Sequence, residues 1–439
     1  MSPRTRELFG LIPVSLLVTA GFTAVLITRS NQTGTATLTY GAVFLGACVL
    51  GHLFIRVRLP HADPYLFPLA ALIAGFGLVI LYRINTAFAI KQAMWFGFGL
   101  ALFCLVILFL RDYRTLERYR YTIAIASLGL LMLPRVPGIG ATANGAYLAV
   151  KIGPLSFQPA EFAKIGIIIF LASYLNDVRD VLVRGRLPRL SLKHFGPLLV
   201  IWGISMLMLI FIRDLGSSLM FFGAFLALLY VATARVSFVI AGLAAFIGGA
   251  WFISQSVAHV HDRIEAWRHP FESLALYEKS SGGSYQIAQS LFAQADGGLF
   301  GKGLGESLLQ IGDNGPILVP AAHTDLVYAI IVNDLGLFGG VGLLCAYLVL
   351  VARGFKTAMV AHDGFVKLLA AGLSAVFALQ VFVIVGGVTR VIPLTGVTLP
   401  FVSAGGSSVL ANFVLLALLL VASDAARRDP LEQGGGLAR

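Results

Sequence analysis

Long apolar stretches recur along this chain, and they constrain its fold more than any other feature. Each is close to the length of about 20 residues that a helix needs to cross a bilayer. The stretches lie at residues 10–27, 37–55, 65–82, 88–110, 121–134, 159–175, 195–212, 215–233, 236–256, 324–352, 365–387 and 401–423. They predict an all-α polytopic membrane protein with about 12 spans, of which the fifth is the shortest.

Composition supports a membrane class. Only 12% of the 439 residues are charged, against roughly 25% in an average soluble domain. Hydrophobic residues make up 58%, and the mean hydropathy is +0.87. A soluble protein of this length would need a charged surface that this chain cannot supply. Composition therefore excludes a disordered chain, a disulfide scaffold and an ordinary soluble enzyme.

Basic residues between the stretches predict the orientation. If both termini are cytoplasmic, the basic loops fall on the cytoplasmic side, as the positive-inside rule expects. These residues are Arg4, Arg6, Arg56, Arg58, Arg111, Arg114, Arg118, Arg120, Arg179, Arg184, Arg186, Arg189, Lys193, Arg353, Lys356, Arg427 and Arg428. The net charge of +11 is thus assigned mostly to topology, and nucleic acid is not an expected partner. The first stretch lacks a signal-peptide cleavage site and is expected to be retained.

Two exterior loops are long under this topology, at residues 134–158 and 259–323. Long loops are uncommon unless functional or disordered. Residues 285–295 have helical spacing, so the second loop is expected to fold over the outer face. His259, His261 and His269 lack the periodicity of a zinc site. The glycine-rich residues 301–305 lack the Walker spacing and predict a turn.

Polar residues within or beside the apolar stretches mark candidate sites, because charge inside a membrane is costly. They are Gln158, Glu161 and Lys164 at the start of the sixth stretch, Asp214 in a short exterior link, His323, Thr324 and Asp325 at the start of the tenth, and Asp334 within it. The i,i+3 spacing of Glu161 and Lys164 lets them pair. Residues 395–408, rich in Gly, Ser and Pro, must pack on protein or line a cavity. These features predict an outer pocket for an anionic, lipid-linked substrate, or polar contacts that only join helices.

Five segments, in order along the chain, carry a resemblance to a known family. They are Asn144-Gly145-Ala146 with Gln158-Pro159-Ala160-Glu161-Phe162-Ala163-Lys164; Asp214-Leu215-Gly216; Gln289-Ser290 with residues 297–305; Ala322-His323-Thr324-Asp325; and Leu394-Thr395-Gly396 through Pro400-Phe401 to Gly405-Gly406-Ser407-Ser408. The chain resembles the SEDS family, the RodA, FtsW and SpoVE proteins of bacterial cell-wall synthesis, over about residues 65–425. The short C-terminal tail and residues 390–393 make it more similar to RodA than to FtsW.

The resemblance implies a domain organisation. Residues 61–426 form a SEDS-like core of ten helices, with residues 257–323 as its long exterior loop. Residues 1–60 form a two-helix membrane extension at the N-terminus, and residues 427–439 form a short cytoplasmic tail.

The resemblance also implies a function. It implies a peptidoglycan glycosyltransferase that polymerises lipid II at the outer face of the bacterial cytoplasmic membrane, for cell elongation or division. Lipid II is a disaccharide-pentapeptide on undecaprenyl pyrophosphate. The implied partner is a class B penicillin-binding protein, which cross-links the product. The essential carboxylate of the family motif corresponds to Asp325.

The residues suit this chemistry. Asp325 is the candidate general base for the attacking sugar hydroxyl. The leaving pyrophosphate needs positive charge, for which Lys164, Arg263 and the backbone amides of residues 405–407 are candidates. No protein metal site is assigned, but Asp325 offers a carboxylate to Mg²⁺ or Mn²⁺. The substrate-binding set is Gln158, Glu161, Lys164, Asp214, Arg263, His323, Thr324, Ser403, Gly405, Gly406, Ser407 and Ser408.

Three segments depart from the family pattern. Residues 147–149 read Tyr-Leu-Ala where the family commonly has basic and tryptophan residues, so Ala149 replaces a tryptophan. Residues 333–336 read Asn-Asp-Leu-Gly in place of Glu-Glu-Leu-Gly, and Ala404 replaces a tyrosine. Two other functions stay open: a lipid II flippase, because intramembrane charge also suits transport, and a catalytically inactive cell-wall scaffold.

Overall fold

The structure, a computed structural model, describes residues 2–30, 35–110, 112–143, 146–153, 155–184, 196, 199–204, 206–207, 214–256, 258–272, 284–307 and 319–428. Its long helices are α1 (Pro3–Ser30), α2 (Thr35–Arg58), α3 (Leu66–Ile84), α4 (Thr86–Phe109), α6 (Arg120–Met132), α7 (Pro159–Arg184), α9 (Leu215–Thr233), α10 (Val236–Ser256), α14 (Val327–Val360), α15 (Gly364–Val388) and α16 (Gly406–Arg427). The shorter elements are α5 (Arg114–Arg118), η1 (Leu133–Arg135), β1 (Gly140–Ala143), β2 (Ala146–Ile152), β3 (Leu155–Phe157), α11 (Ala258–Arg268) and α13 (Tyr285–Gly297).

These helices coincide with the apolar stretches. Every predicted stretch overlaps a long helix, except residues 195–212, of which half lie outside the described residues. Among the described helices, 8 are long and apolar enough to cross a membrane. The shortest stretch corresponds to α6, which has 13 residues. The protein is therefore a nearly all-helical, polytopic membrane protein.

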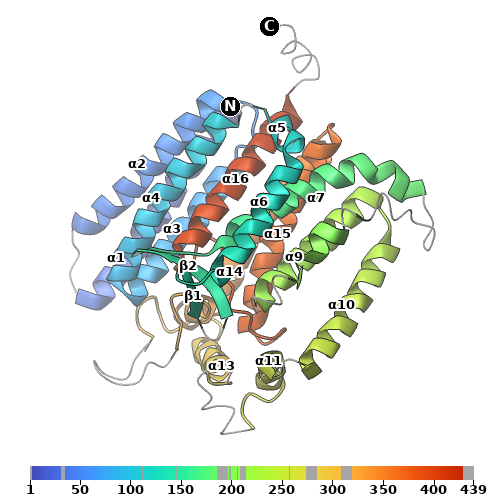
Figure 1. Cartoon of the computed structure of the whole chain (residues 1–439). Coiled ribbons are helices and arrows are strands. Elements are labelled where there is room, and N and C mark those ends of the chain that lie inside the picture. Colours follow the sequence, from blue (N-terminus) through green and yellow to red (C-terminus); the bar gives the residue numbers. More distant parts are fainter. Residues whose placement is uncertain are drawn as a thin grey trace.

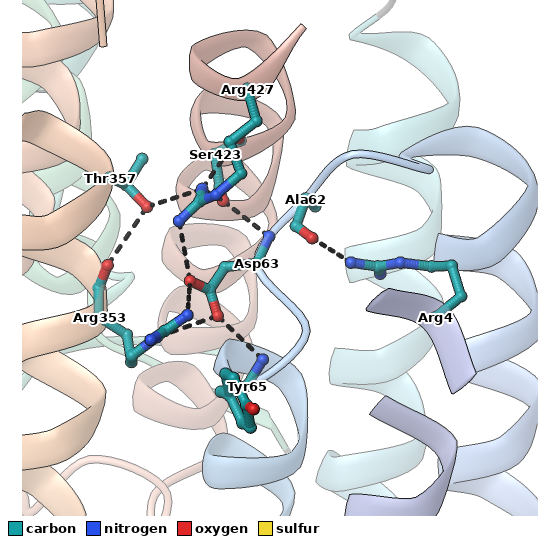
Figure 2. A network of polar contacts seen from close by, with 8 residues as sticks. All are labelled: Arg4, Ala62, Asp63, Tyr65, Arg353, Thr357, Ser423 and Arg427. Carbon is teal, nitrogen blue, oxygen red and sulfur yellow. Dashed lines mark hydrogen bonds and ion pairs between the residues drawn. The ribbon is translucent and has the colours of Figure 1, made fainter. Parts of the chain in front are cut away.

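The two ends of the helical bundle differ in character. The start of α1 and the end of α16 lie at one end, together with Arg4, Arg353 and Arg427 (Figures 1 and 2). We call this the basic end. At the opposite end lie α11, α13 and the small sheet (Figure 1), and we call this the loop end. The positive-inside rule predicts that the loop end faces the exterior.

Burial identifies the centre of the bundle. Most of α15 and α16 is buried inside the protein, whereas α1 and α2 expose large apolar side chains such as Leu16 and Leu50. Apolar side chains that face outward suit a lipid environment, in which their exposure costs little. Two helices, α9 and α15, start at side-chain caps. Asp214 accepts from the amide of Ser217 (2.9 Å), and Asp363 accepts from the amide of Val366 (3.1 Å).

The first long loop contains a small sheet that the sequence analysis missed. β1, β2 and β3 form an antiparallel sheet in that order, in which Val150 pairs with both Gly140 and Phe157. Strands this short give too few residues for a clear alternating pattern. Ala149, which replaces the family tryptophan, is buried in β2 opposite Ala141.

The second long loop folds onto the loop end of α15, as predicted. α13 matches the helical spacing at residues 285–295, and Ser290 donates to the carbonyl of Val388 (2.9 Å). α11 is fixed through reciprocal contacts. Trp267 Nε1 donates to the carbonyl of Arg390 (3.0 Å), and Arg390 Nε donates to the carbonyl of Trp267 (2.8 Å). Both helices are thus held over the segment that follows α15.

A buried carboxylate joins helices at the basic end (Figure 2). Asp63 is 0% exposed and accepts from Arg353 Nε (3.2 Å) and Arg427 Nη2 (2.8 Å). Its amide donates to Ser423 Oγ (2.8 Å), and Arg4 donates to the carbonyl of Ala62. The connection between α2 and α3 thus ties α1, α14 and α16 together.

We expect Asp63→Asn to lower the free energy of unfolding by about 3 kcal/mol, because it leaves two arginines without their counter-charge. Thermal unfolding of the purified protein in detergent measures this loss. The matched control is Asp177→Asn. Asp177 is 47% exposed and paired with Arg120, so the control should cost less than about 1 kcal/mol. Equal melting temperatures for the two variants would contradict the structural role of Asp63.

Candidate active site

Asp325 lies in a tight turn that leads into α14. The amides of Thr324 (3.0 Å) and Leu326 (3.2 Å) both donate to the carbonyl of Ala321, which closes the turn. The carboxylate is half-buried beside Gly396, where a Cβ atom would lie 3.6 Å from Asp325 Oδ2. Gly396 itself is exposed, so this carboxylate lies next to the protein surface at the loop end.

The turn is held by the irregular segment 395–404. The amide of Ala404 donates to the carbonyl of His323 (2.7 Å), and Ser403 Oγ donates to the carbonyl of Thr324 (2.7 Å). Ser403 Oγ also accepts from the amide of Leu399 (2.8 Å). The Gly/Ser/Pro-rich segment therefore packs on protein, as the sequence predicted for irregular backbone at membrane depth.

His323 is fixed by an aromatic contact. Its ring stacks on Phe88, with centroids 4.1 Å apart and planes at 7°. Burial lowers the pKa of His323, so the ring is neutral at pH 7. A neutral, stacked imidazole positions the turn and contributes no charge to the site.

Arg263 is the cation that faces the candidate base. It lies in α11 and donates to the carbonyls of Leu394 (3.2 Å) and Thr395 (3.3 Å). Burial lowers the pKa of Arg263, whereas the charges of Asp214 and Asp325 raise it. Burial in turn raises the pKa of Asp325 to about 6, although Arg263 and a hydrogen bond from Thr324 both lower it. One guanidinium thus serves two carboxylates.

Asp214 is the second carboxylate near Arg263. It caps α9 through the amide (2.9 Å) and the hydroxyl (2.6 Å) of Ser217. Burial raises the pKa of Asp214, its hydrogen bonds from Ser217 lower it, and the charge of Glu161 raises it further. The capping contacts occupy this carboxylate, so it suits a structural role better than proton transfer.

Glu161 and Lys164 form the predicted pair. Lys164 Nζ lies 2.6 Å from Glu161 Oε2 and also donates to Gln380 Oε1 (2.8 Å). Gln380 continues the chain by donating to the carbonyl of Thr398 (3.0 Å). Lys164 is 2% exposed. Its charge is balanced inside the protein, so Arg263 is better placed than Lys164 to meet an anion near Asp325.

The remaining predicted residues line the start of α16. The amide of Gln158 donates to Ser407 Oγ (2.9 Å), and the hydroxyls of Thr398 and Ser408 are 2.8 Å apart. The amide of Gly405 donates to Gln92 Oε1 (3.4 Å). A Cβ atom at Gly406 would lie 2.3 Å from the Trp95 ring. These contacts join α4, α7 and α16 beside the segment 395–404.

The structure thus arranges the predicted residues in two groups. The group around the candidate base contains Asp214, Arg263, His323, Thr324, Asp325 and Ser403. The group around the buried ion pair contains Gln158, Glu161, Lys164, Ser407 and Ser408. The segment 395–404 joins them. The sequence analysis missed Gln92 and Gln380, although a glutamine inside an apolar stretch is itself a signal.

The described residues contain no group of three or more His, Cys, Asp and Glu side chains that could hold a metal ion. Of the two carboxylates near Arg263, Asp214 is occupied by its capping contacts with Ser217, which leaves Asp325 as the candidate ligand. Mg²⁺ commonly binds one or two carboxylates and substrate phosphates. This arrangement therefore suits an ion that is completed by a phosphate-bearing substrate.

Comparison with known proteins agrees with this geometry. The family model FTSW_RODA_SPOVE, described as cell cycle protein, matches residues 65–428. The chain belongs to this family. The match begins next to the start of α3, so α1 and the whole of α2 precede it. Membership and the apolar helices together make this a multi-pass bacterial membrane protein.

Individual relatives place the chain nearer to RodA. It is 40% identical over 448 residues to the peptidoglycan glycosyltransferase RodA of Mycobacterium tuberculosis, covering 97% of this chain and 92% of that one. It is 30% identical to the stage V sporulation protein E of Bacillus subtilis, covering 82% and 96%. A solved structure on the coordination of polymerization and crosslinking by a peptidoglycan synthase complex matches with a TM-score of 0.68 and 26% identity, covering 84% and 99%.

We expect Ser403→Ala to destabilise the protein by about 2 kcal/mol, because it leaves the amide of Leu399 and the carbonyl of Thr324 without their partner. Thermal unfolding measures the effect. Ser374→Ala is the matched control, since Ser374 is equally buried and its hydroxyl bonds within its own helix. A melting temperature that matches the control would show that the contacts of Ser403 with Leu399 and Thr324 are dispensable for stability.

Proposed function

We propose that this protein polymerises lipid II into glycan strands as a peptidoglycan glycosyltransferase, with Asp325 as the general base. One observation carries the proposal. The carboxylate is half-buried beside Arg263 at the loop end, and its pKa is raised to about 6. A base with a pKa near the working pH is ionised there and still accepts a proton effectively. The family and its peptidoglycan glycosyltransferase members support this assignment.

The reaction assigns a separate task to each group. Asp325 takes the proton from the attacking sugar hydroxyl, whose oxygen bonds to the anomeric carbon of the donor. The bond from that carbon to the pyrophosphate oxygen then breaks. Pyrophosphate leaves as a stable anion, so no second carboxylic acid is required, unlike in glycoside hydrolysis. Attack opposite the leaving group inverts the anomeric centre.

Arg263 supplies positive charge to the departing pyrophosphate. Arginine stays protonated in proteins, and its planar group suits phosphate oxygens. Amides at the start of α16, around Gly405 and Gly406, add partial positive charge. A Mg²⁺ or Mn²⁺ ion held by Asp325 and the substrate phosphates would supply further charge stabilisation.

The partner in this proposal is a class B penicillin-binding protein, which cross-links the strands. The structural relative from a peptidoglycan synthase complex supports a partnership between polymerization and crosslinking. Asp325 and Arg263 both belong to this chain, which supports assigning polymerisation to it and cross-linking to the partner.

We expect Asp325→Asn to abolish glycan polymerisation, because the amide cannot accept the hydroxyl proton. Purified protein, with and without a class B penicillin-binding protein, is incubated with lipid II in Mg²⁺, Mn²⁺ or EDTA, and the products are separated on a gel. Glu272→Gln, at an exposed carboxylate of the same end, is the control and should retain full activity.

Other outcomes of this experiment favour the other functions. Polymer made by Asp325→Asn at the wild-type rate would overturn the assignment of the base. Transport of lipid II across vesicles, with no polymer under any condition, would favour a flippase. Partner binding without polymer or transport would favour a scaffold.

The pH profile tests the electrostatics. Because the ionised carboxylate is the active form, we expect kcat/KM to fall as the pH drops through about 6. Arg263 lowers the pKa of Asp325, so Arg263→Gln should move this midpoint to higher pH as well as slow the reaction. Polymerisation assays across buffers from acid to neutral pH measure the shift. An unchanged midpoint would show that Arg263 is not coupled to the base.

A further inference from the structure

α14 contains a break that the reaction above does not use. Gly336 has φ 70° and ψ −175°, so the helix divides into Val327–Leu335 and a longer second part. We call Val327–Leu335 the outer segment. It is about 14 Å long at 1.5 Å per residue, and Asp325 precedes it by two residues. Any displacement of the outer segment therefore moves the candidate base.

The loop formed by residues 297–305 lies along this break. Backbone hydrogen bonds join this loop to the two sides of the break. They run from Lys302 N to Asn333 O (3.0 Å), Gly303 N to Asp334 O (3.0 Å), Leu337 N to Gly298 O (2.9 Å) and Phe338 N to Leu299 O (3.2 Å). They satisfy backbone groups that an interrupted helix leaves unpaired. Cβ atoms at Gly301 and Gly336 would each lie 2.2 Å from a carbonyl oxygen across the contact, so both positions require glycine.

Asp334 fixes the same junction through its side chain. It is 0% exposed, and its Oδ2 lies 3.0 Å from Arg83 Nε at the end of α3. Ser307 donates to Asp334, and Arg83 also donates to the hydroxyl (2.8 Å) and the carbonyl of Ser307. The amide of Gly305 donates to Asp334 Oδ2 (3.4 Å). One buried ion pair thus joins α3, the loop and the outer segment.

We infer that Arg83, Asp334 and Ser307 form a positioning cluster that holds the outer segment, and through it Asp325, in the orientation for proton transfer. This inference rests on the proposed function for its catalytic consequence. Asp334 is more than two helical turns from Asp325 along the chain, so it acts through the helix and is a positioning residue. Ionisable side chains buried deep in a helical bundle usually have a function, or else they join neighbouring helices. For Asp334 the two roles coincide, because the helix segment that it joins to α3 carries the candidate base.

The test uses the full-length protein and three variants. Asp334→Asn removes the carboxylate that pairs with the buried Arg83 guanidinium. Arg83→Gln with Asp334→Asn removes both charges of this pair and retains amide hydrogen bonding. The matched control is Glu272→Gln, since the Glu272 side chain is 72% exposed and pairs with His269 just after α11.

Kinetics separate positioning from lost folding. With rates normalised to the folded fraction from gel filtration, Asp334→Asn should lower kcat by about tenfold or more, because small misplacements of a catalytic group are costly. The KM for lipid II should stay within about twofold. The acid midpoint of kcat/KM should rise, because Asp325 moves relative to Arg263. The double variant should recover part of kcat.

Hydrogen–deuterium exchange supplies a readout that needs no activity. Amides of residues 323–335 should exchange faster in Asp334→Asn than in the wild type, while those of α15 stay unchanged. Glu272→Gln should match the wild type in every measurement.

Each outcome of these measurements either supports or overturns the inference. A wild-type kcat in Asp334→Asn, or a fall in kcat with unchanged exchange and an unchanged acid midpoint, overturns the positioning role. If the wild type makes no polymer, the proposed function fails, and exchange alone decides whether the cluster holds the outer segment. Unchanged exchange then overturns the inference, and faster exchange at residues 323–335 supports it.

Discussion

The tether between the 321–326 turn and the 395–404 segment is the contact on which the loop end depends. The amide of Ala404 and the hydroxyl of Ser403 hold the carbonyls of His323 and Thr324. Neither side of this contact is a helix or a strand, so some of its backbone groups find their partners in the other segment. Each side therefore fixes the other, and together they place Asp325 relative to the helices.

The segment 395–404 is in turn supported by glutamines that rise from the bundle. Gln92 Nε2 donates to the carbonyl of Ser403 (3.0 Å), and Gln380 donates to the carbonyl of Thr398. Gln380 is also a partner of Lys164, so the buried ion pair and the candidate base belong to one connected framework. Burying a carbonyl or ammonium group without a partner costs roughly several kcal/mol. This cost explains why polar side chains occur inside these apolar helices.

Charge is distributed unevenly across this framework, and the difference has chemical consequences. Lys164 and Glu161 neutralise each other in a buried one-to-one pair. Arg263 is shared by Asp214 and Asp325, so neither carboxylate has a full counter-charge. Asp214 is further stabilised by its capping contacts with Ser217. Burial raises the pKa of both carboxylates, but only Asp325 lacks such capping contacts, so Asp325 is the better candidate for a general base.

Local features of this protein follow from its amino-acid pattern. Apolar stretches specify helices through backbone hydrogen bonds within each segment, so the spans, α13 and the i,i+3 pair of Glu161 and Lys164 were predictable. Family motifs pointed to Asp325. Which distant groups meet is set by the folded arrangement of the helices. Arg83 reaches Asp334 across 251 residues, and Ser403 reaches Thr324 across 79. Such contacts depend on how whole helices pack, which no local pattern encodes. The small sheet was missed because its strands are too short to show a period.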